Sequence, residues 1–397
     1  MSTFEAARWA IIADDLTGAA DAAAAYGPTH SSSVILDVDR DWPEAQILSI
    51  NTESRYLPAG EASSVVTAAV QRALGQRRRI FKKFDSLLRG NVGVEVAATL
   101  AQLTGGRADG LAIVAPAFPG TGRTTRGGTV HVNGVPLIGG NFDGDVARAL
   151  SEGGLTVEVM TGGSARSPED LALRLREIQE RGINAVVLDA DVDADLRVIA
   201  AAAELLDFPA FLAGSGGLAG HLAAGRGSTS AGGARARRVN RTLTVIGSYS
   251  GLARQQTDAL IEAGAEHITL DHTSFDGPAV PRLVAEAMTR TDVVLTPDPM
   301  GAVDKSQALV VAEALARATA GGIGHCDALV LTGGETATAV LKTLGAGAFT
   351  VLGEVEPGVV MSLLPGPLPC WSPRPARSGT PARWPGPHNF SLLHRLK

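Results

Sequence analysis

The sequence predicts an α/β protein of two domains, each a mostly parallel sheet flanked by helices. Short apolar runs alternate with longer helical stretches along most of the chain, a pattern typical of parallel sheets that are covered on both faces. Aromatic residues make up only 4% of the chain whereas Ala and Gly abound, which favours close packing of helices on a sheet. At 397 residues the chain exceeds the size at which single hydrophobic cores usually stop growing, so we expect two cores.

The first half of the chain carries one set of these elements. Apolar residues 9–13 predict a short buried strand, and an Ala-rich helix begins near Thr17 and Gly18. Further strands are predicted over residues 33–36, 45–50, 79–84, 110–114, 185–188 and 210–212, and long helices over residues 62–74 and 91–103. Together these elements predict an N-terminal domain over residues 1–221.

A low-complexity stretch follows, residues 222–241, with the sequence LAAGRGSTSAGGARARRVNR. Its Gly, Ser and Arg residues cannot supply a core, so we interpret it as a flexible linker. Beyond it the alternation resumes. Strands are predicted over residues 243–246, 293–296 and 328–332, and helices over residues 252–262 and 306–319, which predicts a C-terminal domain over residues 242–362.

The last 35 residues, 363–397, have a different character. They hold eight of the 21 prolines and two of the four tryptophans of the chain, and we find no helical or strand period in them. Such a composition is typical either of a disordered tail or of a shifted reading frame.

Charge and composition exclude several function classes. The formal net charge is −6 and no long basic block occurs, which argues against nucleic acid as the main partner. Charged residues interrupt the apolar N-terminal stretch, so no signal peptide is predicted, and no uncharged apolar run is long enough to span a bilayer. We therefore expect a cytoplasmic protein without a membrane partner, and the oligomeric state, a homo-oligomer included, stays open.

Asp14 and Asp15 follow the first predicted strand directly. In doubly wound folds the carboxyl ends of the strands open onto the ligand crevice. Two carboxylates there can orient a hydroxyl, take its proton or help to hold a metal. The alternative is that one of them caps the helix that follows.

A second polar cluster lies in KKFDSLLRGN, residues 82–91, again at a strand end that leads into a helix. Lys83, Asp85, Ser86 and Arg89 suit an anionic, hydroxylated ligand, although a solvated helix start with a local ion pair is the alternative. Arg55 also follows a strand and can grip a carboxylate with two hydrogen bonds.

Residues 115–137, rich in Pro, Gly and Thr, predict a long loop, and loops of this length in compact domains tend to be functional. Arg123 and His131 are its polar candidates. A lone His is more often structural than catalytic, so we leave His131 out of the predicted site.

Gly-rich loops between a strand and a helix recur in the second half of the chain. GSYSGLARQQ (residues 247–256) and LTGGETATAVL (residues 331–341) place small residues at helix N-termini, where phosphate groups bind. The chain contains neither a Walker A loop nor a GxGxxG sequence after its first strand, which argues against a dinucleotide-dependent dehydrogenase. Its two cysteines, Cys326 and Cys370, have no partners at metal-ligand spacing, so no protein metal site is predicted.

Taken together, these segments resemble the four-carbon acid sugar kinases, which include D-threonate, D-erythronate and 3-oxo-tetronate kinases. The resemblance rests on an ordered set of motifs over residues 10–362: ADDLTGAAD, TESR, KKFDSLLRGN, PAFPGTGRTT, VNGVPL, GSGGLA, GSYS, TGGETA and GEVEPGV. It implies an N-terminal domain that binds the sugar acid and a C-terminal domain that binds ATP.

The resemblance also implies roles for individual residues. Substrate contacts are expected from Asp14, Arg55, Lys83, Phe84, Asp85, Ser86 and Arg89, and ATP contacts from Ser248, Ser250, Gly333, Gly334, Glu335 and Thr336. Asp15 is our candidate for the base that orients or deprotonates the terminal hydroxyl, with Mg²⁺ neutralising the phosphates of ATP.

The chain departs from the family pattern after residue 362, where GPLPCWSPRPARSGTPARWPG replaces a strand and a Gly-rich loop that helps to close the nucleotide site. We hypothesise a frameshift near residues 367–370, in the gene or in its sequencing. An alternative function follows from it: a non-catalytic sugar-acid-binding protein that has lost ATP turnover.

Overall fold

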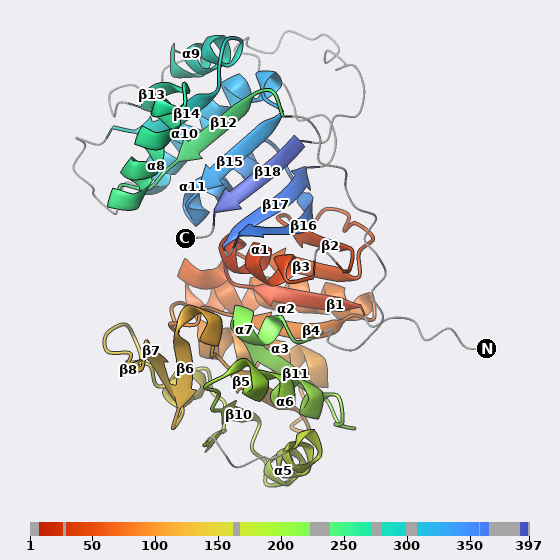
Figure 1. Ribbon diagram of the computed structural model, residues 1–397. Helices are drawn as coiled ribbons and strands as arrows, with labels where there is room; N and C mark the ends of the chain where they lie inside the picture. Colours follow the sequence, from red (N-terminus) through yellow and green to blue (C-terminus); the bar gives the residue numbers. More distant parts are fainter. Residues whose placement is uncertain are drawn as a thin grey trace. The chain divides into compact units, whose positions relative to one another are not determined.

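The computed structural model describes residues 8–26, 29–161, 167–222, 239–270, 279–298, 308–356, 358–364 and 390–395. By its internal contacts the chain divides into two compact units, Met1–Ala231 and Gly232–Lys397 (Figure 1). Each unit contains a sheet in which parallel pairs predominate, with helices packed against it, and this confirms the predicted fold class. Within the described residues, no helix has both the length and the apolar character that crossing a membrane requires.

The main sheet of the first unit is wholly parallel, in the order β2-β3-β1-β4-β11-β5-β10-β9. Its strands are β1 (Trp9–Ala13), β2 (Ser32–Ile35), β3 (Ile47–Asn51), β4 (Arg79–Lys83), β5 (Leu111–Ala115), β9 (Val157–Met160), β10 (Ala185–Leu188) and β11 (Ala210–Gly214). Its helices are α1 (Leu16–Ala24), α2 (Ala59–Gly75), α3 (Val92–Thr104), α4 (Val146–Ser151), α5 (Pro168–Glu180), α6 (Asp193–Ala203) and α7 (Gly216–Ala219). From β1 the chain adds β2 and β3 on one side of the sheet and β4 and the later strands on the other side. The carboxyl end of β1 is therefore a topological switch point.

The core of this unit covers both faces of the sheet. Leu111 and Ile113 of β5 pack with the apolar faces of α1, α5 and α6, whereas Ala112 and Val114 pack with α3 and α4. Successive side chains of a strand point to opposite faces, so a strand buried on both sides must be apolar throughout. This explains why the strand sequences are continuous apolar runs without alternation.

The predicted long loop over residues 115–137 is wrong in part. After a short turn, η2 (Pro119–Thr121), the chain forms a small antiparallel sheet of β6 (Arg123–Arg126), β7 (Thr129–Val132) and β8 (Val135–Pro136). Gly127 and Gly128 have positive φ and allow the tight β6–β7 turn. The abundant glycines that indicated a loop are therefore the turn residues of short strands.

The second unit has the strand order β13-β14-β12-β15-β18-β17-β16. Its strands are β12 (Thr242–Ile246), β13 (Glu266–Leu270), β14 (Val293–Pro297), β15 (Ala328–Thr332), β16 (Ala348–Glu356), β17 (Val359–Leu364) and β18 (Phe390–Arg395). Its helices are α8 (Gly251–Glu262), α9 (Ala279–Met288), α10 (Ala308–Gly322) and α11 (Gly334–Thr343). The pairs from β13 to β18 are parallel, and β16, β17 and β18 pair antiparallel.

Our expectation that no strand period survives after residue 362 is wrong for one stretch. β17 extends to Leu364, and β18, which the sequence placed in an irregular tail, pairs parallel with β15 and antiparallel with β17. Residues 365–389, which include the hypothesised frameshift, lie outside the described residues. So do residues 223–238, most of the predicted linker, whereas Leu222 at its start packs into the core of the first unit.

Candidate functional site

The predicted N-terminal site residues gather at the carboxyl ends of three neighbouring strands. In the registers of β1 with β3 and with β4, Ala13 lies opposite Asn51 and Lys83. Asp14 and Asp15 follow β1, and Arg55 lies in a short turn after β3. The polar side chains therefore emerge at the switch point of the sheet, where ligands bind in open α/β folds.

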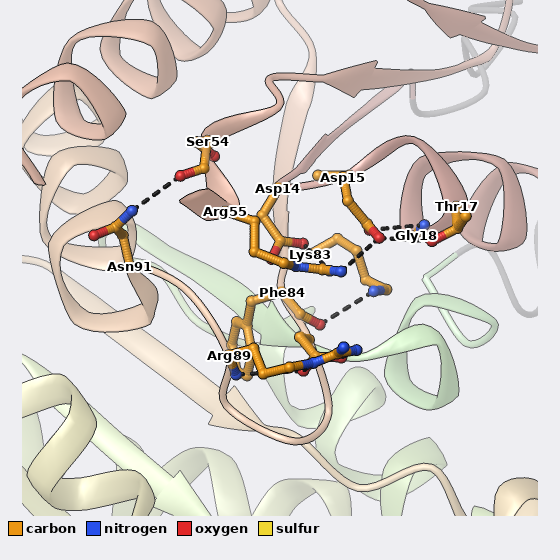
Figure 2. Close-up of polar contacts among 12 residues, drawn as sticks. Asp14, Asp15, Thr17, Gly18, Ser54, Arg55, Lys83, Phe84, Arg89 and Asn91 are labelled. Carbon is orange, nitrogen blue, oxygen red and sulfur yellow. Dashed lines mark hydrogen bonds and ion pairs between the residues drawn. The ribbon is translucent and has the colours of Figure 1, made fainter. Parts of the chain in front are cut away.

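Arg55 lies between the two aspartates (Figure 2). Its Nε and Nη2 donate to Asp14 Oδ2 and Oδ1 at 2.8 and 3.0 Å, and its Nη1 donates to Asp15 Oδ2 at 2.6 Å. Burial lowers the pKa of Arg55, but the aspartate charges and hydrogen bonds outweigh it and raise this pKa above its usual value. Arg55 and Asp14 are both buried, so protein groups already engage the side chain that was expected to grip the substrate.

Asp15 has two local partners besides Arg55. Its Oδ1 accepts from the Gly18 amide at 2.9 Å and its Oδ2 accepts from the Thr17 hydroxyl at 2.6 Å, so Asp15 is also the N-cap of α1. Burial alone would raise the pKa of Asp15, but the charges of Arg55 and Lys83 and these hydrogen bonds lower it. The lowered pKa keeps the carboxylate ionised, and its hydrogen bonds fix its direction. The Asp15 side chain is 23% exposed, so it is still accessible.

Lys83, at the end of β4, completes this corner of the site. Its Nζ donates to the Phe84 carbonyl oxygen at 3.1 Å. A Cβ added at Gly18 would lie 2.5 Å from Asp15 Oδ1 and 2.8 Å from Lys83 Nζ. The Gly of the DDLTG motif therefore leaves room for the carboxylate and the ammonium group to approach the same point. The Phe84 ring packs into the core, so its backbone carbonyl is the part that faces the site cation.

The β4–α3 loop carries a second ion pair. Arg89 binds Asp85 with two hydrogen bonds, from Nε at 2.6 Å and from Nη2 at 3.0 Å, which was the local ion pair weighed as an alternative. Burial raises the pKa of Asp85, but the hydrogen bond and charge of Arg89 lower it below its usual value. Gly90 has a φ of +88°, and a Cβ there would lie 3.0 Å from the Arg55 carbonyl oxygen. This loop is thus packed directly against the turn that carries Arg55.

Sequence reasoning missed a buried ion pair beneath the site. Lys82 Nζ lies 2.6 Å from Glu95 Oε2 of α3 and donates to the carbonyl oxygens of Ile12 and Lys83 at 3.0 and 2.8 Å. Lys82 and Glu95 are 0% and 1% exposed. Burial raises the pKa of Glu95, and the Lys82 charge opposes that shift. Two features of the sequence could have indicated this pair: a Lys inside a buried strand and a Glu on the buried face of a helix. Because a charged side chain is almost never fully buried without a partner, each of the two implies the other.

A further cation reaches the β4–α3 loop from the small sheet. Arg123, the first residue of β6, donates from Nη1 to the Ser86 hydroxyl at 2.6 Å. His131, which we left out of the site, lies on β7, and its Nδ1 is 3.0 Å from the Thr129 carbonyl oxygen.

In the second unit, the two predicted phosphate loops are neighbours. β12 and β15 pair in parallel with Ile246 opposite Thr332, so both loops leave the same edge of the sheet. Gly247 is packed so tightly against Thr336 that a Cβ on it would collide with the Thr336 side chain. Gly333 has a φ of +91° and precedes the first turn of α11, which Gly334, Glu335 and Thr336 form.

The serines of the first loop lie at the start of α8. Ser250 is its N-cap and accepts from the Ala253 amide at 3.2 Å, and the Ser248 hydroxyl accepts from the Ser250 amide at 3.2 Å. Helix N-termini present unpaired backbone N–H groups, and those of α8 and α11 follow adjacent strands. This is an arrangement that suits phosphate groups.

Comparison with protein families identifies both halves. Residues 9–222 match a sugar-binding N-terminal domain, and residues 243–377 match a nucleotide-binding C-terminal domain. A D-threonate kinase from Cupriavidus necator is 36% identical over 402 residues, which span 94% of this chain and 92% of that protein. The chain belongs to the four-carbon acid sugar kinase family.

Other members of this kinase family match over similar lengths. A D-threonate kinase from Bordetella bronchiseptica is 32% identical over 90% of both chains, and a 3-oxo-tetronate kinase from Methylobacterium radiotolerans is 31% identical over 88% of this chain and 90% of that protein. A crystal structure from Salmonella typhimurium has the same fold, with a TM-score of 0.78 and 21% identity over 98% of this chain and 95% of that one.

The ion pair of Asp85 in this kinase predicts a defined pH dependence. A carboxylate whose pKa is lower in the folded state contributes stability above its unfolded pKa, and that stability is lost as the pH falls through the folded pKa. We expect wild type to be more stable than Asp85→Asn by a constant amount from pH 8 to about pH 5, and the difference to shrink below the usual pKa of 3.8. Thermal unfolding of both proteins across this range measures the difference, and one that shrank between pH 8 and about pH 6 would contradict the lowered pKa.

Proposed function

We propose that this chain transfers the γ-phosphate of ATP to the terminal hydroxyl of a four-carbon sugar acid, and that D-threonate is its substrate. The observation that carries the reaction is the accessible Asp15 carboxylate, fixed by Arg55 and the α1 N-terminus beside the Lys83 ammonium group. The relatives named D-threonate kinase, 36%, 32% and 29% identical, support the choice of acid.

Asp15 orients the hydroxyl that attacks the phosphate. Phosphoryl transfer passes through a loose transition state, so positioning and charge stabilisation matter more than a strong base. A carboxylate with a lowered pKa stays ionised and accepts a hydrogen bond from the hydroxyl, and it takes the proton as the new bond forms. Lys83 donates to the substrate from the same corner.

Asp14 and Arg55 act through Asp15 in this proposal. Asp14 is 2% exposed and is held by two hydrogen bonds from Arg55, so it fixes the guanidinium that in turn fixes Asp15. Asp85, Ser86, Arg89 and the backbone of Phe84 line the β4–α3 side of the same site. Of these, Asp85 and Arg89 contact the other hydroxyl groups of the acid.

The second unit binds ATP through its two glycine loops. Ser248 and Ser250 contact the phosphates from the start of α8, and Gly333, Gly334 and Thr336 contact them from the start of α11. The Gly247–Thr336 contact leaves no room for a side chain, as expected where a loop must bring backbone N–H groups close to a phosphate.

Mg²⁺ fits this second site as a companion of ATP. The ion usually binds to one or two carboxylates together with the phosphates, so it needs no dedicated protein cage. The described residues contain no cluster of three metal-ligating side chains, whereas Glu335 in the first turn of α11 and Asp298 after β14 supply single carboxylates near that sheet edge. When bound, Mg²⁺ neutralises phosphate charge.

The deciding experiment is ATP consumption by the purified full chain with Mg²⁺ and D-threonate, D-erythronate or a 3-oxo-tetronate. We expect turnover with D-threonate to exceed that with the other two acids. Turnover with another acid alone would overturn the substrate, and binding of an acid without any turnover would favour the non-catalytic sugar-acid-binding protein. If turnover appears only after a Gly-rich C-terminal loop is restored, the frameshift hypothesis gains support.

Gly247→Ala tests the nucleotide site. Overpacking at a tight contact costs about 1–3 kcal/mol, so we expect the KM for ATP to rise roughly 10- to 100-fold. Affinity for the sugar acid, measured by calorimetry without ATP, stays unchanged. Gly251→Ala is the matched control, because a Cβ at Gly251 meets nothing within 4 Å and should leave both constants unaltered. Equal effects of the two substitutions would contradict the assignment.

A further inference from the structure

Arg123 differs from the other arginines of the sugar-acid site in what it binds. Arg55 pairs with two carboxylates, and Arg89 pairs with Asp85 through two hydrogen bonds. In the part of the chain that the structure describes, the Arg123 guanidinium has the Ser86 hydroxyl as its side-chain partner and no carboxylate. Its charge is therefore available to a ligand.

The charges of the whole site lead to the same residue. The carboxylates of the site are three and its cations are four: Asp14, Asp15 and Asp85 against Arg55, Lys83, Arg89 and Arg123. Among these seven side chains the cations exceed the carboxylates by one. A four-carbon sugar acid brings one negative charge, on its carboxylate, so the two are matched.

The hydrogen bond between Arg123 and Ser86 also sets the direction of the serine hydroxyl. Because Ser86 Oγ accepts from the guanidinium at 2.6 Å, its own O–H is left to donate. The remaining N–H groups of Arg123 and the O–H of Ser86 then form a set of donors alone. Such a set suits a carboxylate better than a neutral CH₂OH group, because the carboxylate brings a negative charge and two oxygens that only accept, whereas the hydroxyl is neutral and has a single oxygen.

The small sheet holds Arg123 rigidly. The backbone of Arg123 exchanges two hydrogen bonds with Phe118, of 2.8 and 3.2 Å. Two residues further on, Thr125 exchanges two with Ala190, which follows β10. The Asp189 carboxylate accepts from the Gly127 and Gly128 amides at 2.7 and 2.9 Å and fixes the β6–β7 turn to the main sheet. The backbone of Arg123 is therefore held in place before a ligand binds, and the hydrogen bond to Ser86 anchors the guanidinium.

We infer that Arg123, with the Ser86 hydroxyl, binds the substrate carboxylate and makes the enzyme select sugar acids over the corresponding sugar alcohols. This inference rests on the proposed function and deepens it, since it assigns the determinant of substrate class to the strand β6. Asp15 and Lys83 hold the hydroxyl that reacts, and Arg123 holds the opposite, charged end of the same molecule.

The test compares Arg123→Met and Arg123→Lys with D-threonate and with threitol, the alcohol that lacks the carboxylate. Charge-assisted hydrogen bonds contribute about 1.5–3 kcal/mol, so Arg123→Met should raise the KM for D-threonate roughly 10- to 100-fold while kcat stays within a few-fold. Activity with threitol should not fall, so the preference for the acid shrinks. Arg123→Lys keeps the charge and should lie between wild type and Arg123→Met.

Arg126→Met is the matched control. Arg126 lies on the same strand, is exposed, and pairs with Asp191 at 2.7 Å, so its loss should alter neither constant. An unchanged KM for D-threonate in Arg123→Met overturns the inference, and so does an equal loss with the acid and the alcohol, which indicates a merely structural role. If Arg123→Met does not fold, Ser86→Ala must reproduce the selective rise in KM, and failure to do so overturns the inference.

Calorimetric titration of D-threonate without ATP separates this inference from the proposed function. Wild type that binds the acid but never consumes ATP refutes the kinase activity, while weaker binding in Arg123→Met still supports the carboxylate site. Wild type that consumes ATP, with binding unchanged in Arg123→Met, refutes the carboxylate site alone. Wild type that neither binds nor phosphorylates any of the three acids refutes both.

Discussion

Asp15→Asn is expected to lower kcat with D-threonate about 10³-fold, within the range of positioned acid–base groups. The substitution removes the charge that accepts the substrate hydroxyl proton but preserves the shape of the side chain. Asn caps helices as well as Asp does, so the hydrogen bond to the Gly18 amide and the start of α1 should persist. Steady-state kinetics with a thermal unfolding scan measures both effects.

The control for this prediction is Asp109→Asn. Asp109 comes just before β5, so it lies at the amino ends of the parallel strands, opposite to the site. It pairs at 3.0 Å with the exposed Arg107. It should leave kcat unchanged. A kcat of Asp15→Asn within tenfold of wild type would contradict the role of Asp15, and a loss of kcat in step with a collapse of the unfolding midpoint would make Asp15 a structural cap alone.

Lys82→Met is expected to destabilise the sugar-binding unit by about 3–5 kcal/mol, because removal of one member of a buried ion pair leaves the other charge uncompensated. Glu95, which is 1% exposed, would then be forced to protonate. Its folded pKa would lie further above the unfolded value, so the loss of stability should grow as the pH rises from about 5 to 8. Urea unfolding of the full chain gives the magnitude, and hydrogen exchange of the β1, β4 and α3 amides assigns it to this unit.

The double variant Lys82→Met with Glu95→Gln removes both charges and should recover much of the lost stability. Lys342→Met, at an exposed position near the end of α11, is the control and should change stability little. If Lys82→Met proved as harmless as Lys342→Met, the pair would not hold β1, β4 and α3 together as its three oxygen partners suggest.

The clustering of the candidate site residues at strand ends could be predicted from the sequence because it depends on local order. Asp14 and Lys83 in the first unit, and Gly333 in the second, each lie at the end of a strand, and parallel strands bring such positions to one edge of their own sheet. The partners could not be predicted. Arg55 meets Asp14 from 41 positions away in the chain, and a strand order is needed to place β3 beside β1. The resemblance named candidate sugar-acid residues, but it did not state that protein carboxylates engage Arg55.

The small sheet and the tail were misjudged for a physical reason. Short strands such as β6 and β8 contain too few residues to display a period, and the glycines in the turns beside them give the segment the composition of a loop. β18 has flanking prolines that suggest disorder, and its pairing with β15 and β17 involves strands more than 20 residues distant in the sequence. Tertiary contacts, rather than local propensity, specify both elements.

The position of β18 has a consequence for the solution behaviour of shortened forms of the chain. β18 occupies the gap between β15 and β17, so its N–H and C=O groups satisfy those of two strands at once. A chain cleaved anywhere between residues 365 and 389 and stripped of the segment beyond would leave both strands with bare edges. Bare edges are templates for pairing with other molecules, and loss of the segment that carries β18 would therefore turn this kinase into an aggregation-prone protein.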